Sequence, residues 1–329
     1  MSKSCLVTGA GGFIGSHLTH WLVRQGWTVR ALVRYTSAGR WGMLHELPAE
    51  ILREVDVVAG DIRDSAQMDQ LVEGRDIVFH LAALIGIPYS YVAPRSYVEV
   101  NVTGTQNILD AARRRDGAVR VVCTSTSEVY GTAHYTPIDE VHRLHPQSPY
   151  AATKVAADQL ALSYQRSFET PVVLIRPFNT YGPRQSTRAV IPTIITQALA
   201  AERTYLELGS LSPQRDLLFV EDTARGFEIA GTAEGIEGEL FNLATNRAVS
   251  IGELAHEILS QTGRPDLEIR TRDERVRPEK SEVHVLLGSA EKMTARTGWK
   301  PEVGLEQGLA RTIEHFRSAA REHDLGYRV

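Results

Sequence analysis

The chain has 329 residues, of which 43% are hydrophobic and 23% are charged, and its formal net charge at pH 7 is −4. This composition is typical of a folded globular protein, which excludes a disordered chain, and the charge gives no general attraction to nucleic acid or anionic lipid. No apolar run approaches the ~20 residues that a membrane span needs, and the N-terminal residues lack the layout of a signal peptide. Cys5 and Cys123 are too few for a disulfide framework and have no metal-ligand spacing. We therefore expect a cytoplasmic protein that binds no nucleic acid, no membrane and no metal.

Short β-branched runs alternate with helical patterns through the first half of the chain. Strands are predicted at residues 4–8, 28–33, 55–59, 77–81, 119–124 and 172–176, and helices at 13–25, 66–72, 96–115 and 150–168. Because the strands are apolar throughout, this alternation predicts an α/β protein whose doubly wound parallel sheet is covered by helices on both faces.

The alternation becomes less regular after Pro177. Loop signals predict connections at residues 179–188 and 209–216, with a helix at 190–201 between them, and residues 241–243 are predicted to return to the sheet. Further helices are predicted at 251–261, 290–297 and 305–323. With about 150 residues per domain as a guide, the change predicts a second, smaller domain.

Gly9, Gly12 and Gly15 form a G-x-x-G-x-x-G motif between the first predicted strand and the first predicted helix. Glycine at these points permits a tight turn and lets a pyrophosphate approach the backbone at a helix N-terminus. Glycines with this spacing also occur in ordinary turns, but the position between strand and helix favours a dinucleotide site.

Two residues that follow strands are candidates for contacts with the adenosine half of the dinucleotide. The second strand ends in Arg34 with no carboxylate nearby, and a cation there tolerates the additional phosphate of NADP, unless Arg34 is simply a surface arginine. Asp61 follows the third strand, where it either accepts a hydrogen bond from the adenine amino group or caps the next helix.

Tyr150 and Lys154 form a Y-x-x-x-K motif on a predicted helix. Residues four apart face the same way on a helix, so the phenol and the ammonium can share one site. A nearby ammonium and a positive nicotinamide ring both favour the phenolate, which predicts a base that works near neutral pH. The preceding strand ends in Thr124 to Glu128, which brings hydroxyls and a carboxylate to the edge where doubly wound sheets bind ligands.

Together these motifs resemble the extended short-chain dehydrogenase/reductase family of NAD-dependent epimerases and dehydratases. The resemblance is carried by the glycine motif, residues 80–83 (HLAA), Asn101, residues 125–131 (STSEVYG), Tyr150 with Lys154, and residues 176–183, 215–222, 277–282 and 298–301. Within the family the chain is most similar to NDP-sugar 4,6-dehydratases, particularly those that act on N-acetylglucosamine nucleotides, and residues 83–91 add to that similarity.

The resemblance implies roles for individual residues. Tyr150 would be the base, Lys154 its activator and ribose anchor, Thr126 a hydrogen-bond partner of the sugar hydroxyl, and Glu128 the group that works at carbon 5, with Ser127 beside it. NAD or NADP would be held by Gly9, Gly12, Phe13, Ile14, Gly15, Arg34, Asp61, Ile62, Leu81, Ala82, Ala83 and Asn101, together with Tyr150 and Lys154. The nucleotide sugar would be held by Ile87, Asn179, Arg184, Arg215 and Arg277.

One departure keeps other reactions open. Dehydratases that act on dTDP-glucose have an Asp as a separate acid at the position where this chain has Ser127. A nucleotide-sugar 4-epimerase and a UDP-glucuronate decarboxylase are therefore alternatives, and a dinucleotide-binding sensor without turnover is the non-enzyme alternative.

The resemblance also implies an architecture and an assembly. We expect residues 1–177 with about 216–250 to form a Rossmann-type dinucleotide-binding domain, and about 178–215 with 251–329 to form a smaller C-terminal domain that binds the nucleotide sugar. The predicted helices at 96–115 and 150–168 carry more apolar residues than one sheet face needs, so we expect a homodimer that pairs them.

Overall fold

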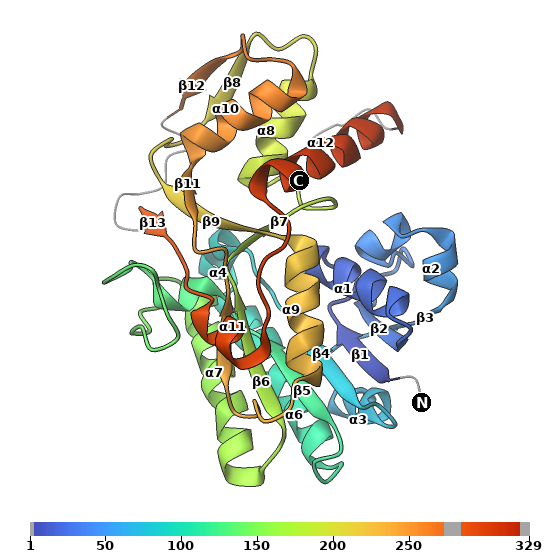
Figure 1. Cartoon of the computed structure of the whole chain (residues 1–329). Helices are drawn as coiled ribbons and strands as arrows, with labels where there is room; N and C mark the ends of the chain where they lie inside the picture. The colour runs from blue at the N-terminus through green and yellow to red at the C-terminus, as the bar shows by residue number, and fades with distance from the viewer. Residues whose placement is uncertain (1–2, 273–283, 323–329) are drawn as a thin grey trace.

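A seven-stranded parallel sheet forms the centre of the protein, in a computed structural model that describes residues 3–272 and 284–322 (Figure 1). The strand order is β10-β6-β5-β4-β1-β2-β3. The bounds are β1 (Ser4–Thr8), β2 (Thr28–Arg34), β3 (Val55–Gly60), β4 (Ile77–His80), β5 (Arg120–Thr124), β6 (Val172–Pro177) and β10 (Leu240–Leu243). The predicted doubly wound parallel sheet is confirmed, and the direction of winding reverses between β1 and β4.

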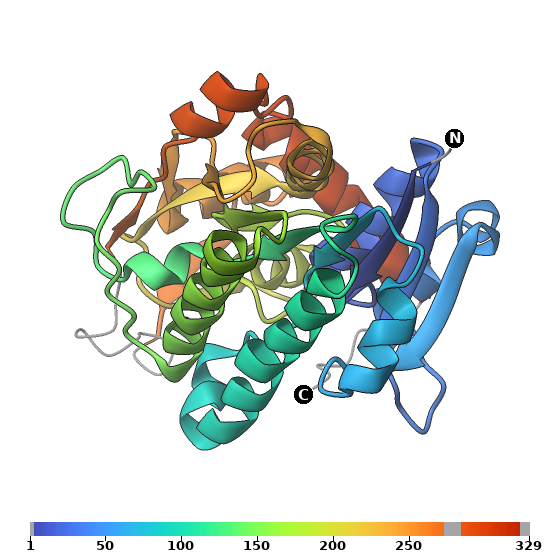
Figure 2. The same cartoon turned by 90° about the horizontal axis from the view of Figure 1, so that it is seen from below.

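Helices cover both faces of this sheet (Figure 2). One face packs against α1 (Phe13–Arg24), α9 (Val220–Thr232) and α11 (Glu291–Thr297), and the other against α3 (Ser65–Val72), α6 (Gly104–Arg113) and α7 (Pro149–Phe168). Shorter helical segments are η1 (Gly42–Glu46), α2 (Ala49–Arg53), α4 (Ile87–Val92), α5 (Pro94–Tyr97) and η3 (Ser127–Tyr130). None of the helices in the described residues is long and apolar enough to cross a membrane.

A second hydrophobic core lies beyond the carboxyl ends of the sheet strands. It packs α8 (Val190–Leu199), α10 (Ile251–Thr262) and α12 (Leu305–Glu322) against β7 (Asn179–Tyr181), β8 (Tyr205–Leu208), β9 (Gln214–Phe219), β11 (Ala248–Ser250) and β12 (Glu268–Thr271). A further strand, β13 (Val285–Leu286), pairs with β9, while its Leu286 packs in the core of the main sheet. Ser250 and Glu253 form a reciprocal capping box that starts α10.

The short strands β8, β11, β12 and β13 were not predicted, and three further features differ from the predicted elements. The loops predicted at 179–188 and 209–216 contain β7 and the start of β9, which pair with each other in parallel register. Helix α9 was not predicted, because Gly226 and Gly231 disfavour a helix locally. Both glycines are required by packing: a Cβ at Gly226 would lie 2.7 Å from Leu243 Cδ1, and one at Gly231 2.8 Å from Phe79 Cζ.

The third difference is the helix predicted at 96–115. It begins earlier, at α5, and passes through a wider π-helical turn, η2 (Val98–Thr103), before α6 continues it. Asn101 lies in this turn, and its amide brackets the backbone of Leu84: Leu84 N–H donates to Asn101 Oδ1 at 2.8 Å, and Asn101 Nδ2 donates to Leu84 O at 3.0 Å. π-helical turns occur frequently at functional sites.

Candidate active site

A cleft of about 1330 Å³ opens at the carboxyl ends of the sheet strands, beside the point where the winding reverses. Doubly wound sheets bind their ligands at this place. Eighteen residues that were predicted to form the site line the cleft: Gly9, Gly12, Phe13, Ile14, Gly15, Arg34, Asp61, Ile62, Leu81, Ala82, Ala83, Ile87, Thr126, Glu128, Tyr150, Lys154, Asn179 and Arg215.

The glycine turn is built so that backbone, not side chain, faces the cleft. Gly9 has a φ of +69°, and a Cβ there would lie 2.7 Å from Ala82 N, while a Cβ at Gly15 would collide with the carbonyl oxygen of Gly9. Gly12 is the N-cap of α1, no side chain caps that end, and the first turn carries no acidic residue. The exposed N–H groups of this turn therefore fit the diphosphate of a dinucleotide.

Charged side chains gather at the far end of the same cleft. Arg63 Nη2 donates to Asp61 Oδ2 at 2.6 Å, and this guanidinium holds the pKa of Asp61 below its usual range. Asp64, not Asp61, caps α3 by accepting from the backbone N–H groups of Ala66 and Gln67, so the capping interpretation of Asp61 is wrong. Arg34 and Arg40 also line this end, and Arg40 was missed because nothing local distinguishes it from other surface arginines.

The predicted catalytic motif, Tyr150 with Lys154, lies at the start of α7, which Ser148 caps by accepting from Ala151 N–H. Tyr150 is only 7% exposed, and burial raises its pKa to about 12. A hydrogen bond with Thr126 opposes that rise, and the carboxylate of Glu128 adds to it. In the protein alone, the effect of burial on the pKa of Tyr150 therefore outweighs the activation that was expected. Formation of the phenolate needs a further positive charge beside it.

Lys154 lies one turn further along α7 and is 5% exposed. Its Nζ donates to the carbonyl oxygen of Thr124 at 2.5 Å, at the end of β5. Burial lowers the pKa of this ammonium, while the carboxylate of Asp158 raises it. The position of Lys154 at the root of the cleft suits an anchor for a ribose hydroxyl.

The turn after β5 presents Thr126 and Glu128 to the cleft but not Ser127. Thr126 is the N-cap of η3 and accepts from Glu128 N–H at 3.3 Å, which holds the Thr126 side chain against the backbone of the turn. Ser127 is 4% exposed and does not line the cleft. Among the described residues that line the cleft, Asp61 and Glu128 are the only carboxylates, and Asp61 is at the opposite end.

Other predicted residues lie elsewhere. Asn101 is buried behind the cleft, where it holds Leu84 and donates to Thr153 Oγ1 at 3.1 Å. Arg184 is 9% exposed with a φ of +64°; it does not line the cleft but faces the charged side chains of Glu46 and Glu221. Arg277 lies outside the described residues. Arg188, which does line the cleft, was missed because it lies beyond the residues 176–183 that carry the resemblance, and Arg184 was chosen from this segment instead.

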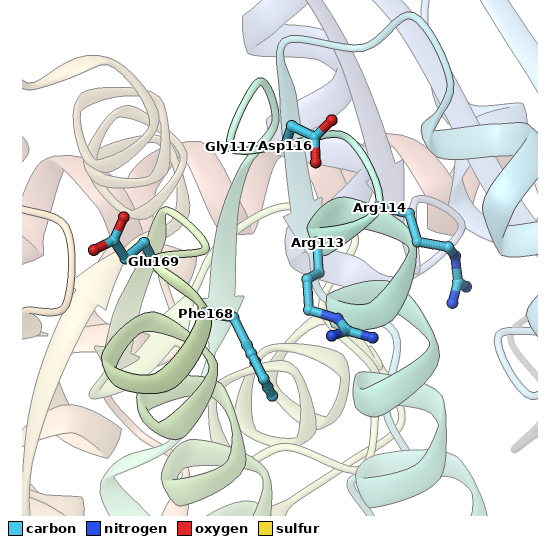
Figure 3. Close-up of a pocket in the computed structure, with 6 residues that line it drawn as sticks. All are labelled: Arg113, Arg114, Asp116, Gly117, Phe168 and Glu169. Atoms are coloured by element: carbon cyan, nitrogen blue, oxygen red, sulfur yellow. The ribbon is translucent and has the colours of Figure 1, made fainter.

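A second hollow, of about 550 Å³, lies at the amino ends of the strands (Figure 3). Its lining residues are Arg113, Arg114, Asp116, Gly117, Phe168 and Glu169. The Arg113 guanidinium lies 4.7 Å from the centre of the Phe168 ring, and Arg114 is paired with Asp69. Its cations are therefore already engaged, and none of the predicted site residues is here. No group of three or more His, Cys, Asp or Glu side chains in residues 3–272 and 284–322 is placed to hold a metal ion.

Comparison with known proteins agrees with this geometry. A family model described as GDP-mannose 4,6 dehydratase matches residues 6–312. The chain belongs to this family, within the extended short-chain dehydrogenases/reductases, and is an enzyme of the NAD-dependent nucleotide-sugar dehydratase and epimerase class.

Similar proteins carry different activities at comparable identity. A UDP-glucose 4-epimerase of Mycolicibacterium smegmatis is 36% identical, over 96% of this chain and 99% of that protein. A UDP-N-acetyl-alpha-D-glucosaminuronate decarboxylase of Bacillus cytotoxicus is 32% identical, over 96% and 98%. The structure of a dTDP-glucose 4,6-dehydratase of Streptomyces venezuelae with NAD bound superposes with a TM-score of 0.85 at 30% identity, over 97% of this chain and 98% of that one. The comparisons therefore establish the family, but they do not distinguish between dehydration, epimerisation and decarboxylation.

Proposed function

We propose that the protein is an NDP-sugar 4,6-dehydratase that holds NAD or NADP, with an N-acetylglucosamine nucleotide as the substrate of first choice. The observation that carries this proposal is Glu128, a carboxylate in the cleft close enough to Tyr150 to raise its pKa. Removal of a proton from carbon 5 requires such a base, whereas inversion at carbon 4 does not.

The residues around the cleft suit the cofactor. The glycine turn would hold the diphosphate, residues Leu81 to Ala83 would lie along the dinucleotide, and Lys154 would hold the nicotinamide ribose. Bound there, the nicotinamide supplies the hydride acceptor for oxidation at carbon 4 and the hydride donor for reduction at carbon 6, so the cofactor is not consumed. Arg34 and Arg40 would bind a 2′-phosphate through their guanidinium groups, which makes NADP a candidate beside NAD.

Protons are then handled by two side chains. Tyr150 takes the proton of the carbon-4 hydroxyl, which Thr126 orients by hydrogen bonding. The 4-ketone acidifies carbon 5, and Glu128 removes that proton. Since Ser127 is turned away from the cleft, Glu128 also returns a proton to the hydroxyl that leaves from carbon 6, so one carboxyl acts first as base and then as acid.

The substrate's nucleotide and diphosphate would lie against Asn179 and Arg215 on the opposite wall, with the sugar near Ile87. A guanidinium suits a diphosphate because it can engage two oxygens at once. We also propose that the protein is a homodimer through α6 and α7, which lie side by side in Figure 2.

Two other reactions use the same opening step. The 36% identity with a UDP-glucose 4-epimerase favours epimerisation, and the similarity to a UDP-sugar decarboxylase favours loss of carbon dioxide. A dinucleotide-binding sensor without turnover would have no use for Tyr150, Lys154, Thr126 and Glu128. The presence of all four therefore speaks against the sensor.

One experiment separates these reactions. The purified protein is incubated with UDP-N-acetylglucosamine, dTDP-glucose, GDP-mannose, UDP-glucose and UDP-glucuronate, and the products are separated by chromatography and identified by mass. Loss of water from one substrate supports the proposal. Loss of carbon dioxide, or a new sugar with unchanged mass, would replace it with the decarboxylase or the epimerase, and no turnover with bound cofactor would favour the sensor.

A further inference from the structure

A buried ion pair lies directly behind the catalytic residues. Asp158 follows Lys154 by one turn on α7, and its Oδ2 is 2.8 Å from Nη2 of Arg176 in β6. The two side chains are 1% and 3% exposed, and neither lines the cleft. Neither has a part in the chemistry described above.

This pair joins the elements that carry the catalytic groups. Ser125 Oγ donates to Asp158 Oδ2 at 2.6 Å, which ties the end of β5, just before Thr126, to α7. Arg176 Nη1 donates to the Tyr130 hydroxyl at 2.9 Å. Tyr130 closes η3, the turn that holds Glu128, so both sides of the active site are fastened to one buried pair.

The Tyr130 hydroxyl in turn donates to Asn242 Oδ1 at 2.8 Å, which extends the network to β10. A buried ion pair often adds no stability over apolar side chains of similar size. We therefore look for the role of the Asp158–Arg176 pair in the groups that it contacts, and not in the stability of the core.

Lys154 is the group that most needs a nearby negative charge, because its ammonium is buried. Three titratable groups on the elements packed around it act on its charge: Asp158 on α7, Cys123 on β5 and His80 on β4. The other charged groups nearby are engaged with different partners, since Arg176 on β6 binds Asp158 and Tyr130, and Glu128 on η3 acts on Tyr150. Burial raises the pKa of the Cys123 thiol to about 12 and lowers that of His80 to about 3, so both are neutral near pH 7. Asp158 is the carboxylate on the same helix face as Lys154.

We propose that Asp158 is a positioning residue: it fastens the turn after β5 to α7 through Ser125 and Arg176, and its carboxylate is the counter-charge of the Lys154 ammonium. It acts through Lys154 and Tyr150 and touches no substrate. The proposal rests on the roles given above to Tyr150 and Lys154, and it holds equally for dehydration, epimerisation or decarboxylation.

Asp158→Asn tests the electrostatic part. Without the carboxylate, the pKa of Lys154 falls further and that of Tyr150 falls as well, because Asp158 raises both. We expect both limbs of the pH profile of kcat/KM to move to lower pH. Asp158→Glu keeps the charge and should leave the limbs in place, and Tyr130→Phe, which disturbs the same network without removing a charge, should lower the rate without moving them.

Binding of NAD gives a second readout that needs no turnover. If Lys154 anchors the ribose as an ammonium, the NAD dissociation constant measured by calorimetry should rise at a lower pH in Asp158→Asn than in the unaltered protein. This titration separates the inference from the proposed function, since a protein inactive on every nucleotide sugar would still report it. If Asp158→Asn fails to fold with Arg176 left unpaired, Asp158→Asn/Arg176→Met is measured instead, with a smaller shift in the same direction. Unmoved limbs and an unmoved NAD titration in the variant that folds, or equal shifts in Asp158→Glu, would overturn the proposal.

Discussion

In the proposed mechanism, Glu128 is the residue that makes dehydration follow the oxidation at carbon 4. General acid–base groups typically contribute ~10²–10⁴-fold to a rate. We expect Glu128→Gln to lower dehydration by about that factor, since it removes both the base for carbon 5 and the acid for carbon 6, and to leave oxidation at carbon 4 detectable as transient absorbance of reduced cofactor. Tyr150→Phe should abolish both. Dehydration at the unaltered rate in Glu128→Gln would contradict the mechanism.

We expect Arg34 to determine whether the site prefers NAD or NADP, because it would lie near the 2′ position of the adenosine ribose. It lines the cleft at the end of β2, beside Arg40, and the nearest carboxylate of the lining, Asp61, is engaged by Arg63. We expect Arg34→Asp to weaken NADP binding relative to NAD, as measured by calorimetry with both dinucleotides, because a carboxylate repels the phosphate and accepts from the ribose hydroxyls. A protein that binds only NAD, with no change in the variant, would make Arg34 an ordinary surface residue.

Asp216 carries a pH dependence of stability. It is fully buried in β9, and burial raises its pKa from 3.8 to about 6 although the Thr245 hydroxyl and backbone N–H groups, including that of Gly288 at 3.3 Å, donate to it. The folded protein therefore binds this proton more tightly than the unfolded chain, so the stability it gives is complete below pH 3.8 and is lost as pH rises through 6. Urea unfolding should show the unaltered protein losing roughly 3 kcal/mol relative to Asp216→Asn between pH 3.5 and 7. A difference between the two proteins that does not vary with pH would refute this.

At the scale of elements, local patterns were sufficient where one segment makes its own structure. The strands from β1 to β6 are short apolar runs, the glycine turn between β1 and α1 is fixed by its own backbone, and α7 carries the spacing of Tyr150 and Lys154, so each could be predicted. Pairing between distant segments could not: β7 is three residues long and exists because β9 lies beside it. Helix α9 and the turn η2 are held by tertiary contacts that oppose the local preference.

The same distinction applies to the site. Side chains that immediately follow a strand, such as Thr126 and Glu128, could be assigned to the cleft because the topology brings strand ends together. The direction in which a side chain points within a turn could not be predicted from the sequence. For this reason Ser127 and Arg184 were assigned to the site, although neither lines the cleft. The buried pair of Asp158 and Arg176 joins residues that are 18 apart in sequence, and no local signal relates them.

The π-helical turn η2 gives a prediction at the element scale. Asn101→Ala would remove the amide that brackets Leu84, leaving a partly buried N–H and carbonyl without partners, which costs about 1–3 kcal/mol. We expect a lower melting temperature and weaker cofactor binding, since residues next to Leu84 line the cleft. Thr103→Ala, an exposed position on the same turn, is the matched control. An Asn101→Ala protein that is as stable as this control would show that the bracket is not what holds the turn.

At the scale of the whole molecule, the proposed homodimer depends on the outer face of the helices η2, α6 and α7. Part of the apolar surface predicted on these helices is used within the single chain: Ile108 and Leu109 of α6 are fully buried there and so give no support to a dimer. What remains on that face is smaller: Val98 is 49% exposed, Ala156 is exposed, and Leu160 is half-buried. These three belong to the two neighbouring segments η2 and α7, as a paired helix face requires.

Light scattering at micromolar concentration measures the assembly directly, and we expect twice the mass of the chain. Val98→Arg combined with Ala156→Arg should convert the dimer to a folded monomer, because both positions are exposed in one chain and a second copy would have to bury the added charges. Val141→Arg, at an 87% exposed position in the loop before α7, is the control and should remain a dimer. If the unaltered protein is monomeric, or the double variant keeps its mass, the face formed by η2 and α7 is not the interface.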